Sequence, residues 1–205
     1  MKTIIKYELV INKALRSALN YDTPDEQINE FIRFFGKHIG SDRIYIFEDC
    51  DEKHVTKNTY EWCADGIVPE IHELQNVDMD IIGWWYQAFD NEKNIIITDI
   101  EQIKDEHRGS YNLLKAQNVK NLVVCPIRYK DEIKGFFGVD NPPESDTLGL
   151  TTFLDMIGTL LISLLKLRNS FTKSNKEAKL SSYSSLSSIY ISMALVNVQT
   201  RRYTI

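Results

Sequence analysis

Near the start of the chain, apolar residues recur at the spacing of a helix. Ile4, Tyr7, Ile11 and Ala14 follow one another at steps of three or four residues, which places them on one face of a helix. The pattern predicts a helix over residues 2–20 with that face buried.

A second helix is predicted to begin after Thr23. The segment Thr23-Pro24-Asp25-Glu26 supplies a capping hydroxyl, a proline in the first turn and a carboxylate three residues after the cap. This combination is typical of a helix start. Gly40 follows the apolar face of this segment and is expected to end the helix.

The middle of the chain alternates between short β-rich runs and helical patterns. The predicted strands span residues 43–48, 55–63, 95–98, 122–127 and 133–139, and the predicted helices span residues 79–90 and 109–117. The last two strands form a hairpin, and each is apolar on both of its faces. We therefore expect both faces of the sheet to be covered.

A long helix is predicted from about residue 146. Its apolar residues recur at alternating steps of three and four, which is the spacing of a coiled-coil seam. The seam consists of Leu150, Phe153, Ile157, Leu160, Leu164, Leu167 and Phe171. A second stripe consists of Leu154, Leu161 and Leu165. We expect one stripe to pack on the domain and the seam to meet the same helix of a second chain; the alternative is that both stripes pack on the sheet.

The composition changes near residue 170. Residues 171–205 hold eight serines, five basic residues and one acidic residue, a net charge of +4. We therefore expect an N-terminal helix over residues 1–22, one folded domain over residues 23–170, and a linker of different character over residues 171–205.

The overall composition excludes several classes of protein. The chain has 205 residues, a net charge of −5 and 43% hydrophobic residues, which is too much apolar surface for a disordered chain. The acidic balance disfavours nucleic-acid binding. The most apolar run, Met156–Leu165, is well short of the ~20 residues that a membrane helix needs, so we expect no membrane insertion.

The three cysteines, Cys50, Cys63 and Cys125, are too widely spaced for a Cys-x-x-Cys motif. An odd number of cysteines, without a signal-peptide pattern, favours a reducing cytoplasm. The sequence contains no HExxH motif, no phosphate-binding glycine loop and no other recognisable catalytic set. We therefore expect neither a metal site nor catalysis.

The hairpin carries the most specific motif of the chain. Residues 125–128 read Cys-Pro-Ile-Arg, and residues 133–141 read Ile-Lys-Gly-Phe-Phe-Gly-Val-Asp-Asn. A Pro-aliphatic strand end, a polar turn and a Gly-aliphatic strand ending in Asp or Asn resemble the GAF domain, a small-molecule sensor module of bacterial signalling proteins. Residues 59–67 look like the GAF subgroup found ahead of diguanylate cyclase and other output domains.

The resemblance implies an α+β fold with a central antiparallel sheet of about six strands. The helices near the chain ends would lie on one face, and residues 64–118 would roof a pocket on the other. A small molecule of unknown identity would close this roof, and the terminal helices of a homodimer would pass the shift to a downstream output domain.

The segment from Leu186 resembles the opening strands of a PAS-like domain. That resemblance implies that the chain is a piece of a longer sensor protein. The alternative is a terminal arm that pairs with the main sheet.

Seven residues are candidates for contact with the ligand. Tyr60 and Trp62 alternate on one predicted strand and so share a face, while Trp85 and Phe89 share a face of the predicted roof helix. The full set is Tyr60, Trp62, Trp84, Trp85, Phe89, Asp99 and Tyr111. Aromatic rings with a polar tip suit planar ligands; core packing is the alternative for each ring, and a helix cap is the alternative for Asp99.

No cofactor known from GAF domains is indicated, so the cofactor is left unknown. The cyclic-nucleotide signature is incomplete, since residues 91–93 are not followed by the Phe and Asp-Glu that it requires. No cysteine precedes a histidine, as bilin attachment in phytochrome-like GAF domains requires. The four histidines, His38, His54, His72 and His107, are scattered along the chain, which disfavours haem.

Two other functions fit the sequence. The domain can be a ligand-free scaffold that dimerises and spaces its neighbours, with Trp84, Trp85 and Phe89 filling the cavity. One GAF-like family is a reductase of free methionine sulfoxide that uses three cysteines. The cysteine count matches that family, but its Gly-rich cysteine loop is missing here.

Overall fold

The computed structural model describes residues 2–143, 150, 153–154 and 156–177. It divides into two compact units, Met1–Leu165 and Lys166–Ile205. Within the described ranges, no helix is long and apolar enough to cross a membrane. The strands predicted after Leu186 lie outside the described residues.

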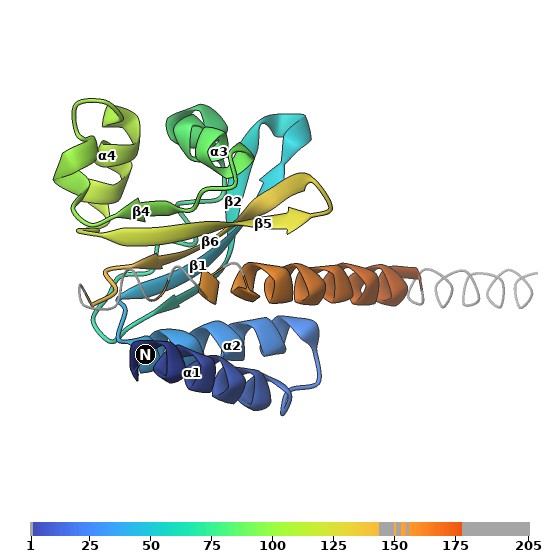
Figure 1. Ribbon diagram of the computed structural model, residues 1–205. Coiled ribbons are helices and arrows are strands. Elements are labelled where there is room, and N and C mark those ends of the chain that lie inside the picture. The colour runs from blue at the N-terminus through green and yellow to red at the C-terminus, as the bar shows by residue number, and fades with distance from the viewer. Residues whose placement is uncertain (1, 144–149, 151–152, 155, 178–205) are drawn as a thin grey trace, which may run out of the picture. The chain divides into compact units, whose positions relative to one another are not determined.

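The first unit has an α+β fold built on a six-stranded antiparallel sheet (Figure 1), as expected. The strands are β1 (Arg43–Cys50), β2 (Val55–Cys63), β3 (Val77–Asp78), β4 (Ile95–Ile97), β5 (Leu122–Tyr129) and β6 (Glu132–Asp140). Their order in the sheet is β3-β2-β1-β6-β5-β4. The predicted hairpin forms β5 and β6, and β6 pairs on its other edge with β1.

Helices cover both faces of this sheet (Figure 1). The α-helices are α1 (Lys2–Ala18), α2 (Pro24–Ile39), α3 (Gly83–Asp90) and α4 (Arg108–Ala116), and residues 156–165 are also helical. Three short 3₁₀ helices are η1 (Asp51–Lys53), η2 (Met79–Ile82) and η3 (Ile100–Ile103).

The predicted start and end of α2 are confirmed. The Thr23 hydroxyl accepts a hydrogen bond from the Glu26 backbone N–H, and the Glu26 carboxylate accepts one from the Thr23 backbone N–H. Gly40 ends the helix in the left-handed region at φ 77°, where glycine has no steric penalty.

One face of the sheet packs against α1, α2 and the helical residues up to Leu165. The central strands contribute alternate apolar side chains to this core, because successive residues of a strand point to opposite faces. Those strand residues are Ile44, Ile46, Tyr60, Val123, Cys125, Ile127, Phe137 and Val139.

Both predicted stripes of the long helix contribute to this core. Leu154, Leu161 and Leu165 are buried, and so are Leu150, Phe153 and Ile157 of the seam. Leu160 and Leu164 are half-buried, and Leu167 and Phe171 of the second unit are exposed. The first three seam residues are therefore not available to a partner chain, and dimerisation through the others stays a prediction.

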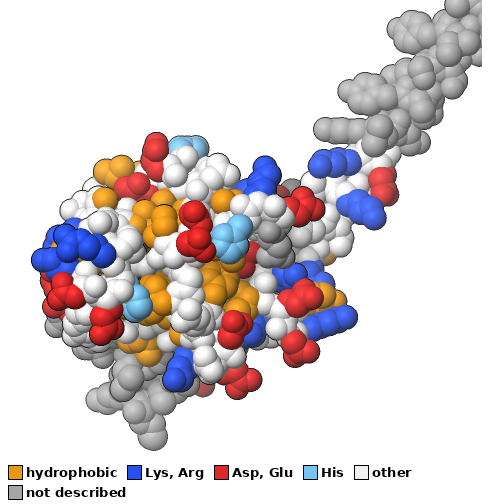
Figure 2. Space-filling view, turned by 90° about the horizontal axis from the view of Figure 1, so that it is seen from above, with side chains coloured by type: hydrophobic (Ala, Val, Ile, Leu, Met, Phe, Trp, Pro, Cys, Tyr) orange, Lys and Arg blue, Asp and Glu red, His pale blue; other side chains and the backbone are white. Residues whose placement is uncertain are grey.

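The other face is covered by the segments between β2 and β5, which form the roof. The roof comprises η2, α3, η3 and α4 with their connecting loops. Seen from this side, hydrophobic patches alternate with acidic and basic side chains (Figure 2). This arrangement confirms the expected placement of the chain segments on the two faces of the sheet.

Candidate functional site

A small cavity lies between the roof and the sheet. Its volume is about 40 Å³, which is room for a few water molecules at ~10–15 Å³ each. The aromatic part of its wall consists of Tyr45, Phe47, Trp85 and Phe136. These rings pack on one another, with Phe136 stacked 4.7 Å from Phe47 and edge-on to Trp85 at 5.5 Å.

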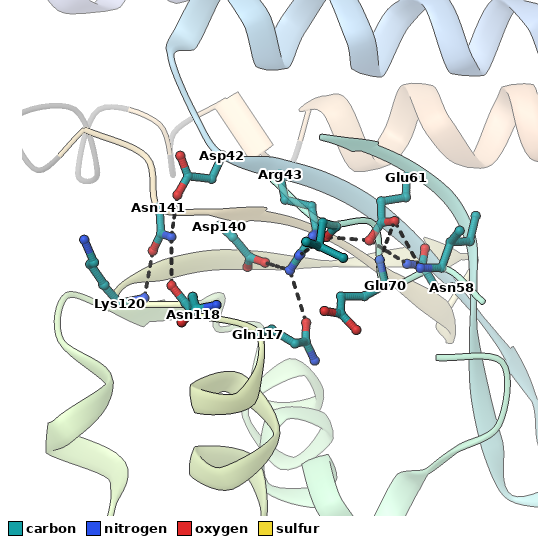
Figure 3. Close-up of polar contacts among 12 residues, drawn as sticks. Asp42, Arg43, Asn58, Glu61, Glu70, Gln117, Asn118, Lys120, Asp140 and Asn141 are labelled. Atoms are coloured by element: carbon teal, nitrogen blue, oxygen red, sulfur yellow. Dashed lines mark hydrogen bonds and ion pairs between the residues drawn. The ribbon is translucent and has the colours of Figure 1, made fainter. Parts of the chain in front are cut away.

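Three charged side chains form the polar end of the cavity (Figure 3). Arg43 Nη1 donates to Asp140 Oδ2 at 3.2 Å, and Arg43 Nε lies 3.3 Å from Glu61 Oε1. All three side chains are at most 3% exposed. We call this set the buried charge cluster.

Strand register explains how these residues meet. Arg43 lies opposite Asp140 in the β1–β6 pair, and Tyr45 lies opposite Glu61 in the β1–β2 pair. A bulge at Thr59 shifts the register of β2 and so changes which of its residues face the roof. Glu61 and Asn58 both line the cavity as a result.

The buried charge cluster also holds the loop that follows β2. Glu61 Oε2 accepts hydrogen bonds from the backbone N–H groups of Glu70 and Ile71 at 2.9 and 3.0 Å. Arg43 Nη2 donates to the Val68 carbonyl at 2.8 Å. The cluster therefore ties the sheet to one side of the roof.

A second cavity of about 110 Å³ adjoins the first and opens beside the same loop. Arg43, Gln117 and Asp140 line both cavities. Arg43 Nη1 donates to Gln117 Oε1 at 3.2 Å, and this hydrogen bond joins β1 to the end of α4 where both cavities are lined by the same residues.

The buried charge cluster carries a formal net charge of −1, since one guanidinium faces two carboxylates. Burial raises the pKa of Asp140 to about 7, although Arg43 and the Tyr45 hydroxyl both favour the charged form. The same burial raises the pKa of Tyr45 well above its usual value. Asp140 thus changes its charge near neutral pH.

Three buried polar atoms at the cavity have no hydrogen-bond partner within the described part of the chain: Arg43 Nε, Trp85 Nε1 and Asp140 Oδ1. Arg43 Nε lies against Glu61 in an ion pair, which leaves two atoms without any polar partner, the acceptor Asp140 Oδ1 and the donor Trp85 Nε1. Their side chains are 2% and 4% exposed. The Tyr45 hydroxyl lies near Asp140, but no hydrogen bond of good geometry reaches Oδ1. Buried polar atoms are normally paired, so these two are the strongest sign of a ligand site.

Of the seven predicted ligand contacts, Trp85 alone lines this cavity. Tyr60 and Trp62 do share a face, but it is the opposite face, because the bulge at Thr59 sets the register of β2. The Tyr60 hydroxyl donates to Asp25 of α2, and the Trp62 ring packs against α2. This corrects the orientation that the sequence led us to expect.

The other four candidates lie in the roof and do not line the cavity. Trp84 Nε1 donates to Ser110 Oγ at 2.9 Å and links α3 to α4. Phe89 is fully buried in the roof core. Asp99 caps η3 by accepting from the Glu101 N–H. The Tyr111 hydroxyl donates to Glu101 at 3.1 Å.

The charged residues of the cavity were missed at the level of sequence. One signal was present, since Arg43 lies two residues before Tyr45 and Asp140 two residues after Gly138, each in phase with the roof-facing side of its strand. A charged residue in phase with a buried face calls for a partner. The partner of Arg43 is 97 positions away, which the local pattern does not show.

Asn141, the last residue of the hairpin motif, has a structural role. Its Oδ1 accepts from the Lys120 N–H at 2.7 Å, and its Nδ2 donates to Asp42 at 2.7 Å and to the Asn118 carbonyl at 3.2 Å (Figure 3). It therefore joins the ends of β1, β5 and β6 beside the buried charge cluster.

One surface group brings together side chains of metal-ligating types. His54, Asp78 and Asp80 place ligand atoms within 4.8 Å of one another, and all three are exposed. His54 Nε2 lies 2.9 Å from Asp80 Oδ1, and this contact raises the pKa of His54. The pair ties the β1–β2 hairpin to η2, and we assign no ion to it.

This architecture is the fold of a GAF domain, as the hairpin motif implied. Two solved structures show the likeness. The GAF domain of an Acinetobacter phosphoenolpyruvate-protein phosphotransferase matches with a TM-score of 0.60 and 9% identity over 82% of this chain and 97% of that chain. The far-red-absorbing dark state of a protein with bound biliverdin IXa matches with a TM-score of 0.63 and 12% identity over 78% of this chain and 99% of that chain.

Sequence comparison gives a distant relation to a signalling enzyme. The chain is 24% identical over 127 residues to the methanogenesis regulatory histidine kinase FilI of Methanothrix harundinacea. The match covers 60% of this chain and 14% of the kinase. No protein-family model matches the chain.

Proposed function

We propose that this chain is a small-molecule-sensing module of a signal-transduction protein. The observation that carries the proposal is the cavity under the roof, where an unpaired carboxylate oxygen and an unpaired indole N–H are buried among aromatic rings. A folded domain keeps such atoms unpaired at a cost, which a bound molecule with matching groups removes.

Strand β6 offers the route for the signal. Asp140 and Phe136 face the cavity, whereas Phe137 and Val139 of the same strand face the terminal helices. A shift of β6 on ligand binding therefore reaches the helical residues that end at Leu165. A coupling of ~1–3 kcal/mol suffices for regulation.

The output belongs to a longer chain in this proposal. The partial match to a much larger histidine kinase supports an output domain in the same chain as the module. We propose that this output domain is a kinase or a diguanylate cyclase downstream of the module. A homodimer would bring two such domains together, with the unburied part of the seam, Leu160, Leu164, Leu167 and Phe171, as the contact.

The ligand-free scaffold remains the second candidate, and the cavity size favours it. About 40 Å³ is far below the ~300–1,000 Å³ of typical ligand pockets. A scaffold requires only a stable fold and a dimer contact, and the aromatic rings of the roof then serve as core.

The cysteine positions disfavour the reductase alternative. Cys50 and Cys63 lie at opposite ends of the β1–β2 hairpin, where they pair with Val55 and Arg43. A strand rise of ~3.3 Å per residue puts them roughly 20 Å apart, beyond disulfide reach. Burial raises the pKa of Cys63, which lowers its reactivity. We propose a module without catalysis of its own.

Native mass spectrometry of the purified protein, beside a denatured sample, tests this function. A dimer with an added mass that is lost on denaturation supports the sensing module and gives the mass of the ligand. The scaffold predicts a dimer without added mass. If, in addition, a panel of small metabolites leaves the thermal stability of this dimer unchanged, the result contradicts sensing and supports the scaffold.

A further inference from the structure

The charge and shape of the cavity limit what can bind there. Arg43 is neutralised by Glu61, contacts the Val68 carbonyl and Gln117, and touches one oxygen of Asp140. The second oxygen, Oδ1, is left as an acceptor without a partner in the residues that the structure covers. When Asp140 is deprotonated, the unmatched charge of the site is therefore negative and lies on this carboxylate.

The rest of the wall favours a positive ligand over a neutral one. Tyr45, Phe47, Trp85 and Phe136 surround the same space, and aromatic faces attract cations within about 6 Å of the ring centre. Ca²⁺ and Mg²⁺ are disfavoured, because they need six or more oxygen ligands and this wall is mostly apolar. Zn²⁺ is disfavoured because none of the described residues of the wall is His or Cys. Organic ammonium ions fit both the rings and the carboxylate.

We infer that the cavity binds a small organic ammonium ion, with its N–H groups donating to Asp140 Oδ1 and its carbon atoms against the four rings. This inference rests on the proposed sensing function and names the class of its ligand. The volume allows about four non-hydrogen atoms. A ligand that also carries a hydroxyl would accept a hydrogen bond from Trp85 Nε1.

The binding is linked to the protonation of Asp140. The charged and titratable groups that interact with Asp140 are Arg43 and Tyr45 of β1 and Glu61 and Cys63 of β2. The ammonium ion needs the carboxylate, so a proton competes with it. With a pKa of about 7 for Asp140, the affinity should fall by ~30-fold from pH 8 to pH 5.5.

Three two-carbon probes of similar size and different charge test the inference: ethanolammonium chloride, ethylene glycol and sodium glycolate. Each is titrated into the full chain at constant ionic strength, and the indole N–H signal of Trp85, assigned with Trp85→Phe, is followed by NMR. Ethanolammonium is expected to bind at least ~10-fold more tightly than the other two, in line with one charge-assisted hydrogen bond.

Variants locate the binding. Asp140→Asn should weaken ethanolammonium binding by at least ~10-fold, whereas Asp105→Asn, on the exposed surface, should leave it unchanged. Trp85→Phe keeps an aromatic ring, removes the N–H donor, and should have a smaller effect than Asp140→Asn. Isothermal titration calorimetry gives these affinities where the Trp85 signal is lost.

The outcomes separate this inference from the proposed function. If glycolate or ethylene glycol binds as tightly as ethanolammonium, or if Asp140→Asn has no effect, the ammonium class is wrong while a small-molecule site stands. If none of the probes shifts the Trp85 signal at tens of millimolar, the inference fails. The mass-spectrometric result then decides separately whether another class of ligand binds.

Discussion

The two faces of the sheet use the same strands and different chemistry. Phe136 and Phe137 are neighbours in β6, yet Phe137 packs against the terminal helices and Phe136 lines the cavity. One face of the sheet packs against α1 and α2, and we call it the helix face; its strand side chains in the core are hydrophobic. The other face lies under the roof, and we call it the roof face; there the same strands bury Arg43, Glu61 and Asp140.

This difference separates the residues that stabilise the fold from the residues that are candidates for function. Apolar burial contributes most of the stability of a domain, and the helix face supplies it. A buried ion pair is weak evidence for stability, and a buried carboxylate with a free oxygen lowers stability. A perturbed acidic group beside a cavity is a candidate functional residue.

The largest expected loss of stability comes from a substitution in the core of the helix face. Phe137→Ala should destabilise the protein by ~3–5 kcal/mol, because Phe137 is fully buried between the sheet and α2. Phe136→Ala should cost less, ~2–3 kcal/mol, because the roof of short helices and loops can relax into the space. Urea unfolding of the two variants measures the difference, and equal losses would contradict the contrast between the faces.

The second effect tests the charge on the roof face. The folded protein holds the Asp140 proton up to about pH 7, whereas the unfolded chain releases it near pH 4. The folded state thus binds more protons between these values, so this group makes stability fall as the pH rises, by about 1.4 kcal/mol per unit. Above about pH 7 the loss is complete.

Asp140→Asn isolates this effect because it mimics the protonated form. Relative to the unmodified protein, the variant should gain ~2–3 kcal/mol of stability between pH 5 and pH 7.5. Urea unfolding at the two pH values measures the gain, with Asp105→Asn as the exposed control. A difference that does not change with pH would show that Asp140 is already charged at pH 5.

Local chemistry explains which parts of this fold the sequence predicts. The cap at Thr23, the stop at Gly40 and the β5–β6 hairpin each depend on residues close in sequence, and each was confirmed. The prediction that both faces of the sheet are covered followed from strands that are apolar on both faces. Only Trp85 of the predicted contacts lines the cavity, so the site was predicted far less well than the fold.

The reasons for that failure are non-local. The bulge at Thr59 reverses the phase of β2 relative to simple alternation, so Tyr60 and Trp62 face α2 while Glu61 faces the cavity. The partners of Arg43 are set by the pairing of β1 with two strands, one of which is distant in sequence. A side chain's own neighbours in sequence carry no information about such pairings.

A third prediction concerns how closely α2 approaches the sheet. A Cβ at Gly36 would lie 2.3 Å from ring carbons of Trp62, so Gly36→Ala should destabilise by about 1 kcal/mol, with overpacking outweighing the gain in helix propensity. Gly83→Ala in the roof meets nothing within 4 Å and should be neutral or stabilising by up to ~1 kcal/mol. Chemical denaturation of both variants provides the comparison.

A Trp62→Leu background provides the control, because it removes the ring that the new Cβ would meet. In this background Gly36→Ala should no longer lower stability, and a loss of stability that persists there would place the strain elsewhere.

The smallest effect on stability is expected for Leu167→Asp, and this substitution tests whether the seam forms a dimer contact. Leu160 and Leu164 pack partly against the helix-face core, so aspartate there would damage the fold as well as a contact. Leu167 is 53% exposed, so Leu167→Asp should change stability by less than ~0.5 kcal/mol while shifting the protein from dimer to monomer in sedimentation experiments. Ser170→Asp, also exposed, is the control for added charge and should leave the dimer intact. If Leu167→Asp stays dimeric, the seam is not the contact, and if the unmodified protein is already monomeric, the signal needs a route that involves no second copy of the helix.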